Sequence, residues 1–128
     1  MWIRRFGGNL FQLYMLALPA RMNFEKRRHS FPPLVAKAQA VGAAVQRELG
    51  WQVQPFPVRT NMFHVLIPGD YGTLTTRIRA ARTPGFNASA WPDYSPAGFC
   101  RCEFTVGEAT LECEDRQLLE NFSSLPET

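Results

Sequence analysis

The chain has 128 residues, of which 45% are hydrophobic and 12% aromatic, values that exclude a disordered chain and fit one folded domain. The net charge of +3 comes almost wholly from arginine and is too small to indicate nucleic-acid binding. No apolar run is long enough to span a membrane. We therefore expect neither nucleic acid nor a membrane as a partner.

Residues Asn9 to about Phe24 carry apolar side chains at helical spacing, which predicts a first helix with Asn9 as its N-cap. Pro19 is expected to kink this helix or end it early. The same apolar run crudely resembles a signal peptide, but glycine and polar residues interrupt it, so we favour a helix of the domain. Residues 25–29 are charged and are interpreted as a solvated linker.

A second helix is predicted from about Ser30, a candidate cap, to Gly50, a common C-terminal stop. Two prolines fall in its first turn, where proline is tolerated. Its apolar stripe consists of Leu34, Ala38, Val41, Val45 and Leu49.

Two strands are predicted next, a short one at 51–54 and a longer one at 60–68. In the longer strand both alternating sets of side chains are mostly apolar. This pattern favours a strand in the middle of a sheet, covered on both faces.

A third helix is predicted after Asp70 or Thr73, either of which can cap it, and residues 83–85 should end it. Its inward face would consist of Leu74, Ile78 and Ala81, and its arginines Arg77, Arg79 and Arg82 would face mostly outward.

Residues 86–98 are rich in turn-forming residues and predict a structured loop with a short strand around 86–88, anchored by Phe86, Trp91 and Tyr94. Residues 99–106 alternate as a half-buried strand, with Arg101 on one side and Cys102 on the other. A last helix is predicted at 114–122.

This order of elements predicts an α+β fold, a small antiparallel sheet covered by helices, in a single small domain over residues 1–128. Residues 1–29 would form its leading helix and linker, and residues 30–128 its α+β core. The residues alone show no glycine-rich phosphate loop, no nucleophile with a base, and no paired carboxylates. No catalytic residue is therefore predicted.

Three cysteines, an odd number without a disulfide framework, indicate a reducing compartment and hence a cytoplasmic protein. A secreted domain is the alternative, and it would require cleavage near Ala20 and a disulfide. Cys100, Cys102, Cys113 and His64 fit no common zinc spacing, so no metal site is predicted.

Three segments, in this order and at these separations, resemble the C-terminal third of the threonine aldolase and β-eliminating lyase family, which are pyridoxal-phosphate (PLP) enzymes of fold type I. They are Trp2-Ile3-Arg4-Arg5-Phe6-Gly7-Gly8-Asn9-Leu10-Phe11, Thr60-Asn61-Met62-Phe63 and Phe104-Thr105-Val106-Gly107-Glu108-Ala109-Thr110-Leu111-Glu112. The resemblance implies a small C-terminal domain with an antiparallel sheet and helices on one side.

In that family a preceding large domain carries the lysine that forms the Schiff base with PLP. Lys26 and Lys37, the two lysines of this chain, lack the family's lysine motif. The resemblance therefore implies PLP in the complete enzyme, and no cofactor for this chain alone. Residues 1–29 would then join the chain to a missing large domain.

The resemblance also implies candidate site residues. The family's carboxylate-binding arginine falls nearest Cys102, so Arg101 is the substrate-binding candidate only if the register is shifted by one residue. The family's basic pair before the two glycines is present here as Arg4 and Arg5, which are further substrate-binding candidates. The family's arginine after the glycines corresponds to Phe11 in this chain, so that contact is missing.

Three more residues are candidates for the active-site side. They are Asn9, Thr60 and Asn61. The last two can equally cap the strand and satisfy local backbone groups.

The expected function is the C-terminal portion of a PLP-dependent amino-acid lyase, inactive without its large domain. The family works as homo-oligomers, so partner surfaces are implied. Without the large domain, the first helix would expose an apolar patch, which predicts self-association; the patch consists of Leu10, Phe11, Tyr14 and Leu18. The alternative is a stand-alone, non-catalytic binding or regulatory module on the same α+β sheet.

Overall fold

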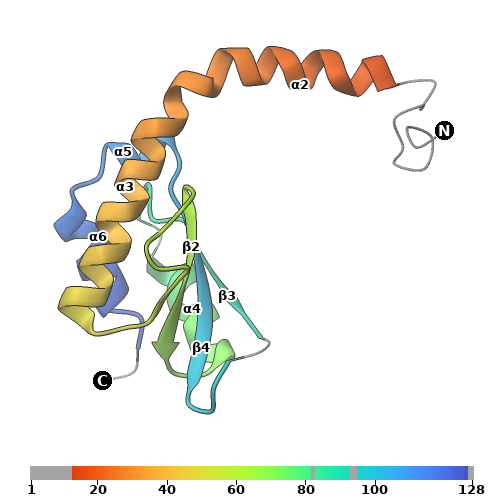
Figure 1. The fold of residues 1–128 in the computed structure, drawn as a ribbon. Coiled ribbons are helices and arrows are strands. Elements are labelled where there is room, and N and C mark those ends of the chain that lie inside the picture. The colour runs from red at the N-terminus through yellow and green to blue at the C-terminus, as the bar shows by residue number, and fades with distance from the viewer. Residues whose placement is uncertain (1–12, 82, 93–94, 127–128) are drawn as a thin grey trace. The chain divides into compact units, whose positions relative to one another are not determined.

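The computed structural model describes residues 13–81, 83–92 and 95–126, and Figure 1 shows their arrangement. The chain divides into two compact units, Met1–Phe31 and Pro32–Thr128, which are described separately.

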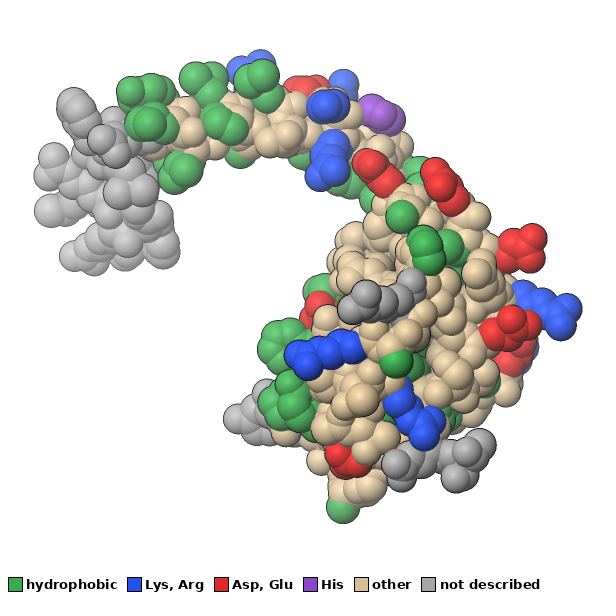
Figure 2. All heavy atoms as spheres, turned by 180° about the vertical axis from the view of Figure 1, so that it is seen from behind, with side chains coloured by type: hydrophobic (Ala, Val, Ile, Leu, Met, Phe, Trp, Pro, Cys, Tyr) green, Lys and Arg blue, Asp and Glu red, His purple; other side chains and the backbone are tan. Residues whose placement is uncertain are grey.

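In the first unit, the described residues form helix α2 (Leu13–Arg27) and a 3₁₀ turn (Arg28–Ser30). No residue of α2 is buried, and Figure 2 shows hydrophobic side chains exposed along it. Helix α2 does not end early at Pro19, one of the two outcomes expected there, because it runs on to Arg27. Residues 25–29, the expected linker, are exposed and helical, the first three in α2 and the last two in the 3₁₀ turn. The charged residues of the expected linker are good helix formers, and Arg28 pairs with Glu25 at 3.1 Å.

The second unit contains a four-stranded antiparallel sheet in the order β1-β2-β4-β3. The strands are β1 (Val53–Gln54), β2 (Met62–Pro68), β3 (Ala88–Trp91) and β4 (Phe99–Thr105). As predicted, the longest apolar strand, β2, lies in the middle of the sheet. The short strand expected around 86–88 is in fact β3, two residues further along the chain.

The helices of the second unit are α3 (Phe31–Ala44), which continues as a π-helical turn (Val45–Leu49), α4 (Tyr71–Ala81), α5 (Glu108–Leu111) and α6 (Asp115–Ser123). The predicted stop at Gly50 is confirmed by its left-handed φ of 68°. The short helix α5 was not predicted. The α+β fold class expected from the sequence is confirmed.

One face of the sheet and the helices share a single core. Its sheet residues are Val53, Phe63, Val65, Ile67, Cys100, Cys102 and Phe104, and its helix residues include Leu34, Ala38, Val41, Val45, Leu74, Leu118 and Phe122. Helices α3, α4 and α6 therefore cover the same face of the sheet. The rings of Phe104 and Phe122 meet at a centroid distance of 5.0 Å within this core.

The expectation that β2 is covered on both faces was wrong. Phe63, Val65 and Ile67 are buried, whereas the side chains between them are only half-buried or exposed. Helices α3, α4 and α6 cover only the other face, since their core residues, among them Leu34, Leu74 and Leu118, pack against Phe63, Val65 and Ile67 in one cluster.

Two further expectations change. Arg77 does not simply face outward, because its guanidinium donates hydrogen bonds to the carbonyls of Ser124, at 3.3 Å, and Pro126. Trp91, expected to anchor a loop, is 43% exposed at the end of β3; Tyr94 lies outside the described residues. None of the helices in the described ranges has the length and apolar character needed to cross a membrane.

Candidate functional site: the uncovered face of the sheet

The sheet face that carries no helix of the second unit holds the charged side chains of the strands, together with exposed aromatic and aliphatic ones. We refer to it as the uncovered face. The register of the four strands places on it Gln54, Met62, His64, Leu66, Pro68, Ser89, Trp91, Phe99, Arg101, Glu103 and Thr105.

Arg101 lies in the middle of β4 on this face, between Leu66 of β2 and Trp91 of β3 in the register. Its side chain is half-buried, and its backbone N–H donates a hydrogen bond to Ser95 Oγ at 2.8 Å. Cys102 points the other way, into the core, with no exposed surface. Of these two neighbours, only Arg101 has a charged side chain on a surface that a ligand can reach.

The next row of the uncovered face contains an acid–base pair. His64 and Glu103 are opposite each other in the β2–β4 register, and His64 Nε2 lies 3.5 Å from Glu103 Oε2. Both side chains are about a quarter to a third exposed, at 30% and 24%. Because Glu103 follows Arg101 by two residues on the same strand, the pair lies on the same face as the arginine. Sequence analysis did not select this pair; the alternation of β2 and β4 was the signal that could have found it.

Thr60 and Asn61 precede β2, and their side chains bond to backbone groups. Thr60 Oγ1 donates to the Met62 carbonyl at 2.9 Å and accepts from the Met62 N–H at 3.2 Å. Asn61 Nδ2 donates to the Val106 carbonyl at 2.9 Å, which ties the start of β2 to the end of β4. Both side chains thus satisfy local backbone groups, which is the alternative to an active-site role that the sequence allowed for them.

Arg4, Arg5 and Asn9, the remaining candidates, lie outside the described residues. The structure therefore brings Arg101 together with His64 and Glu103, neither of which was a candidate.

The described lysines do not fit the Schiff-base role in PLP chemistry. Lys37 Nζ is 2.5 Å from Asp115 Oδ1 and donates to the Cys113 carbonyl at 2.6 Å, so it joins α3 to the start of α6 and to the segment before it. Lys26 lies in the last turn of α2, in the other unit. A lysine that attacks an aldehyde must present its amine to the cofactor, whereas the Lys37 amine is bound to a carboxylate and a backbone carbonyl of the chain.

The cysteines do not form a metal site with His64. Cys100 and Cys102 point into the core, whereas His64 lies on the opposite face of the sheet. Burial raises the pKa of both thiols, that of Cys102 to about 12. Within the described ranges, no cluster of three or more histidine, cysteine or carboxylate side chains could hold a metal ion.

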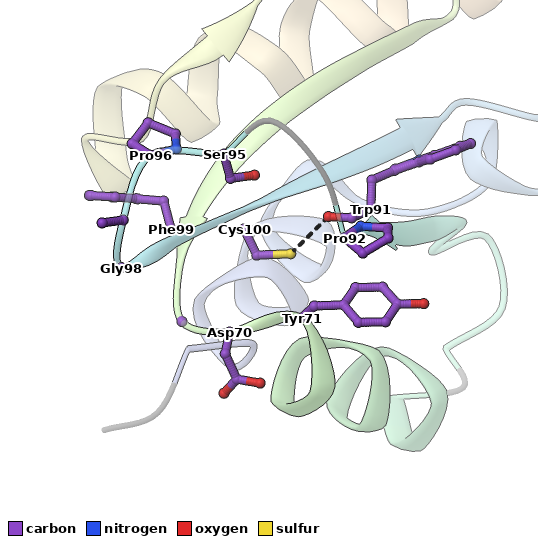
Figure 3. Close-up of a pocket in the computed structure, with 11 residues that line it drawn as sticks. Asp70, Tyr71, Trp91, Pro92, Ser95, Pro96, Gly98, Phe99 and Cys100 are labelled. Atoms are coloured by element: carbon purple, nitrogen blue, oxygen red, sulfur yellow. Dashed lines mark hydrogen bonds between the residues drawn. The ribbon is translucent and has the colours of Figure 1, made fainter.

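A cleft of about 520 Å³ lies at one end of the sheet, between the β2–α4 turn and the start of β4 (Figure 3). Asp70, Tyr71, Trp91 and Phe99 are among the residues that line it. Asp70 is used within the chain, because its carboxylate accepts hydrogen bonds from the Thr73 N–H at 3.0 Å and the Thr73 hydroxyl at 2.6 Å. These bonds hold the pKa of the Asp70 carboxyl below its usual value and cap α4, as the sequence predicted.

No family model matches the chain, and no curated protein matches it. Among solved structures, the chain is similar to an aromatic amino acid β-eliminating lyase/threonine aldolase from Exiguobacterium sp. 255-15, with a TM-score of 0.65 and 23% sequence identity. The similarity covers 97% of this chain and 35% of that protein, a share equal to the C-terminal third that the sequence resemblance indicated. The resemblance is confirmed as a likeness of fold: over nearly its whole length, the chain has the fold of part of a threonine aldolase/β-eliminating lyase.

Proposed function

We propose that this chain is the small domain of a PLP-dependent amino-acid lyase of the threonine aldolase or β-eliminating type. The observation that carries the proposal is the likeness of fold over 97% of this chain but only 35% of the related lyase. Catalysis would then require a larger domain that is not among these 128 residues. When bound in such a domain, PLP supplies an electron sink for the carbanion formed at the amino acid.

Within this proposal, Arg101 binds the carboxylate of the amino-acid substrate. The guanidinium lies on the uncovered face, and arginine is suited to bidentate binding of a carboxylate. The neighbouring His64–Glu103 pair, at 3.5 Å, places a proton donor and acceptor beside the bound substrate. These residues orient the substrate, and the lysine that reacts with the cofactor comes from the larger domain.

The proposal includes an assembly. We expect a homo-oligomer in the cytoplasm, with the exposed apolar side chains of α2 in contact with the larger domain or another subunit. Helix α2 supports this expectation, because none of its residues is buried within the chain and Leu16 and Met22 are 66% and 71% exposed.

The test begins with the natural product that contains these residues. The gene is sequenced upstream of Met1, and an antibody against the chain is used to purify the product from the source organism. We expect a protein about three times as long, with the absorbance of bound PLP and with lyase activity on threonine or an aromatic amino acid. A natural product of 14.5 kDa that carries no PLP would overturn the proposal.

The role of Arg101 is tested in the longer product. Arg101→Lys keeps the charge but loses the bidentate geometry, so the KM for the amino acid should rise roughly tenfold or more. Arg79→Gln, on the exposed side of α4, is the matched control and should leave KM unchanged. An unchanged KM in Arg101→Lys would remove Arg101 from the site.

The second candidate function is a stand-alone binding module without catalysis. It is favoured by the complete core of the second unit, whose buried residues run from Leu34 to Leu125. It is also favoured by Lys37, which is engaged with Asp115. A 14.5 kDa natural product that binds an amino acid without cofactor would support this candidate.

A further inference from the structure

The two units of the chain carry charge of opposite sign. The first unit, Met1–Phe31, contains six arginine and lysine residues but only one glutamate. Residues 108–120 of the second unit contain five aspartate and glutamate residues but only one arginine. Because one chain carries both a basic and an acidic segment, one copy of the chain can attract another.

On α2, basic side chains border exposed apolar ones. Leu18 and Met22 are four residues apart, and residues three or four apart are neighbours on a helix surface. By the same spacing, Arg21 is a neighbour of Leu18 and Lys26 is a neighbour of Met22. None of these side chains is buried, and among the described residues neither Arg21 nor Lys26 has an ion-pair partner. The helix therefore offers an apolar stripe flanked by cations.

The acidic residues of the second unit lie on α5, on α6 and on the segment between them. We refer to them as the acidic surface, which consists of Glu108, Glu112, Glu114, Asp115 and Glu120, all exposed. Figure 2 shows acidic side chains gathered on one side of the second unit. Asp115 and Glu120 are paired with cations of the same unit. Within the described part of the chain, Glu112 and Glu114 have no ion-pair partner.

An exposed apolar side chain lies within the acidic surface. Leu111, the last residue of α5, is 36% exposed, with Glu108 three residues before it and Glu112 directly after it. The acidic surface thus combines apolar contact area with charge, as α2 does, but the charge has the opposite sign. Burial of apolar surface drives association, and complementary charges select the partner and fix its orientation.

We propose that α2 of one copy of the chain docks on the acidic surface of a second copy. Arg21 and Lys26 face the acidic surface, and the apolar stripe of α2 contacts Leu111. Because each copy carries both surfaces, two copies can form the contact twice and close as a symmetric dimer. The inference extends the assembly that the proposed function includes, although both surfaces belong to this chain alone and need no cofactor.

Such a contact depends on ionic strength. Exposed charges are screened beyond about 10 Å at 0.1 M salt and beyond about 3 Å at 1 M salt. The dissociation constant of the self-associated chain, measured by sedimentation velocity, should therefore rise roughly tenfold or more between about 0.05 M and 1 M NaCl. Association through apolar contact alone would not weaken with added salt.

Charge reversal tests the pairing of the two surfaces. The first variant, Arg21→Glu with Lys26→Glu, makes α2 acidic, and the second, Glu112→Lys with Glu114→Lys, adds cations to the acidic surface. Each variant places like charges together, so its dissociation constant should be at least roughly tenfold higher than that of the parent chain.

A mixture of the two variants gives the decisive result. The acidic helix of the first variant fits the altered surface of the second, and the unchanged helix of the second fits the unchanged surface of the first. An equal mixture should therefore associate about as tightly as the parent chain, although neither variant does so alone.

A matched control changes the net charge by the same amount elsewhere. Arg59→Glu with Arg79→Glu alters the charge as the first variant does, at two exposed positions of the second unit outside the acidic surface. This control should associate as the parent chain does. Circular dichroism of each variant shows whether it is folded, and recovery in the mixture shows that both variants are.

A monomeric parent chain at low salt, unchanged association in either charge-reversed variant, an equal loss in the control, or no recovery in the mixture would overturn the inference. Its failure is distinguishable from that of the proposed function. If the natural product is a PLP lyase but the mixture does not associate, only the docking of α2 on the acidic surface is lost. If the natural product has no PLP but the mixture associates, the docking stands without the lyase.

Discussion

Phe104 lies at the centre of the aromatic part of the core. Its ring centroid is 5.6 Å from that of Phe63, 5.4 Å from Phe86 and 5.0 Å from Phe122. The side chain is fully buried and joins β4 to β2, to the segment before β3, and to α6. It therefore holds together elements that are far apart in the sequence.

We predict that Phe104→Ala lowers the free energy of unfolding by about 3–5 kcal/mol, because the substitution removes buried apolar surface and leaves a cavity. Urea denaturation followed by circular dichroism measures the change. Phe99→Ala is the control, since Phe99 is on the same strand, on the uncovered face and 44% exposed. A loss below about 1 kcal/mol in Phe104→Ala would show that the surrounding rings close the cavity.

Cys102 makes the stability depend on pH in the alkaline range. Burial raises the pKa of its thiol to about 12, from an ordinary value of 9.0. Between these values the thiol is protonated in the folded chain and ionised in the unfolded chain. The unfolded state then binds fewer protons, so stability falls as pH rises through this window.

We predict that this loss amounts to about 2 kcal/mol between pH 8 and 10.5, at 1.36 kcal/mol per unit above pH 9. Cys102→Ala should lack this part of the decline, whereas Cys113→Ala should retain it. Urea titrations of the three proteins at each pH measure the difference. Parallel pH profiles of Cys102→Ala and the parent chain would contradict the prediction.

At the residue scale, the sequence predicted which strand residues share a face. It could not identify which of Arg101 and Cys102 faces the helices, because a shift of one residue reverses the faces. In the structure, the helices cover the side of the sheet on which Cys102 lies, so Arg101 is on the uncovered face. The His64–Glu103 pair depends on the alignment of two strands about forty residues apart, which no local pattern specifies.

Among the elements, α3 lies close to the β1–β2 connection because of a glycine. A Cβ atom on Gly42 would lie 2.7 Å from Val58 Cγ2, closer than such contacts occur, and Val58 is itself buried. Glycine inside a helix normally costs stability relative to alanine. At this position it allows the helix to approach the chain that leads into β2.

We predict that Gly42→Ala destabilises the chain by about 1–3 kcal/mol, the range for overpacking, despite the better helix propensity of alanine. Thermal unfolding measures the change. Gly42→Ala with Val58→Ala should recover part of the loss, because the second substitution removes the clashing methyl group. If Gly42→Ala is more stable than the parent chain, the contact between the new Cβ atom and Val58 does not destabilise the fold, and the prediction is wrong.

The elements with clear periodicity were predicted well, and those with mixed signals were not. Helix α3 and strand β4 follow their apolar patterns closely. The helical conformation of the charged residues at 25–29 was not predicted, because charge is common to solvated linkers and to exposed helices. Strand β3 was misplaced because its residues, Ala88–Trp91, carry little hydrophobic pattern of their own.

For the molecule as a whole, the two units differ in how they are stabilised. All buried side chains of the described residues belong to the second unit, from Leu34 to Leu125. Helix α2 has none, although its first two turns, residues 13–20, contain no polar side chain other than the hydroxyl of Tyr14. A helix with apolar residues on all sides is normally enclosed by other protein.

We predict that the isolated chain self-associates through α2. Sedimentation velocity should show species larger than 14.5 kDa that dissociate on dilution. A double variant, Leu16→Glu with Met22→Glu, should be monomeric, because these two most exposed apolar side chains would carry charge. A matched variant, Gln46→Glu with Gln52→Glu, adds the same charge to exposed positions of the second unit and should still associate.

A shortened chain of residues 30–126 completes the test. It contains every buried residue of the core, so it should fold and sediment as a monomer. If the shortened chain still associates, the contact lies on the second unit, and the exposed Met62, Trp91 and Phe99 of the uncovered face become the surface to mutate next. If the full chain is a monodisperse monomer, α2 does not drive association, and the exposed helix no longer supports the expectation of a partner subunit.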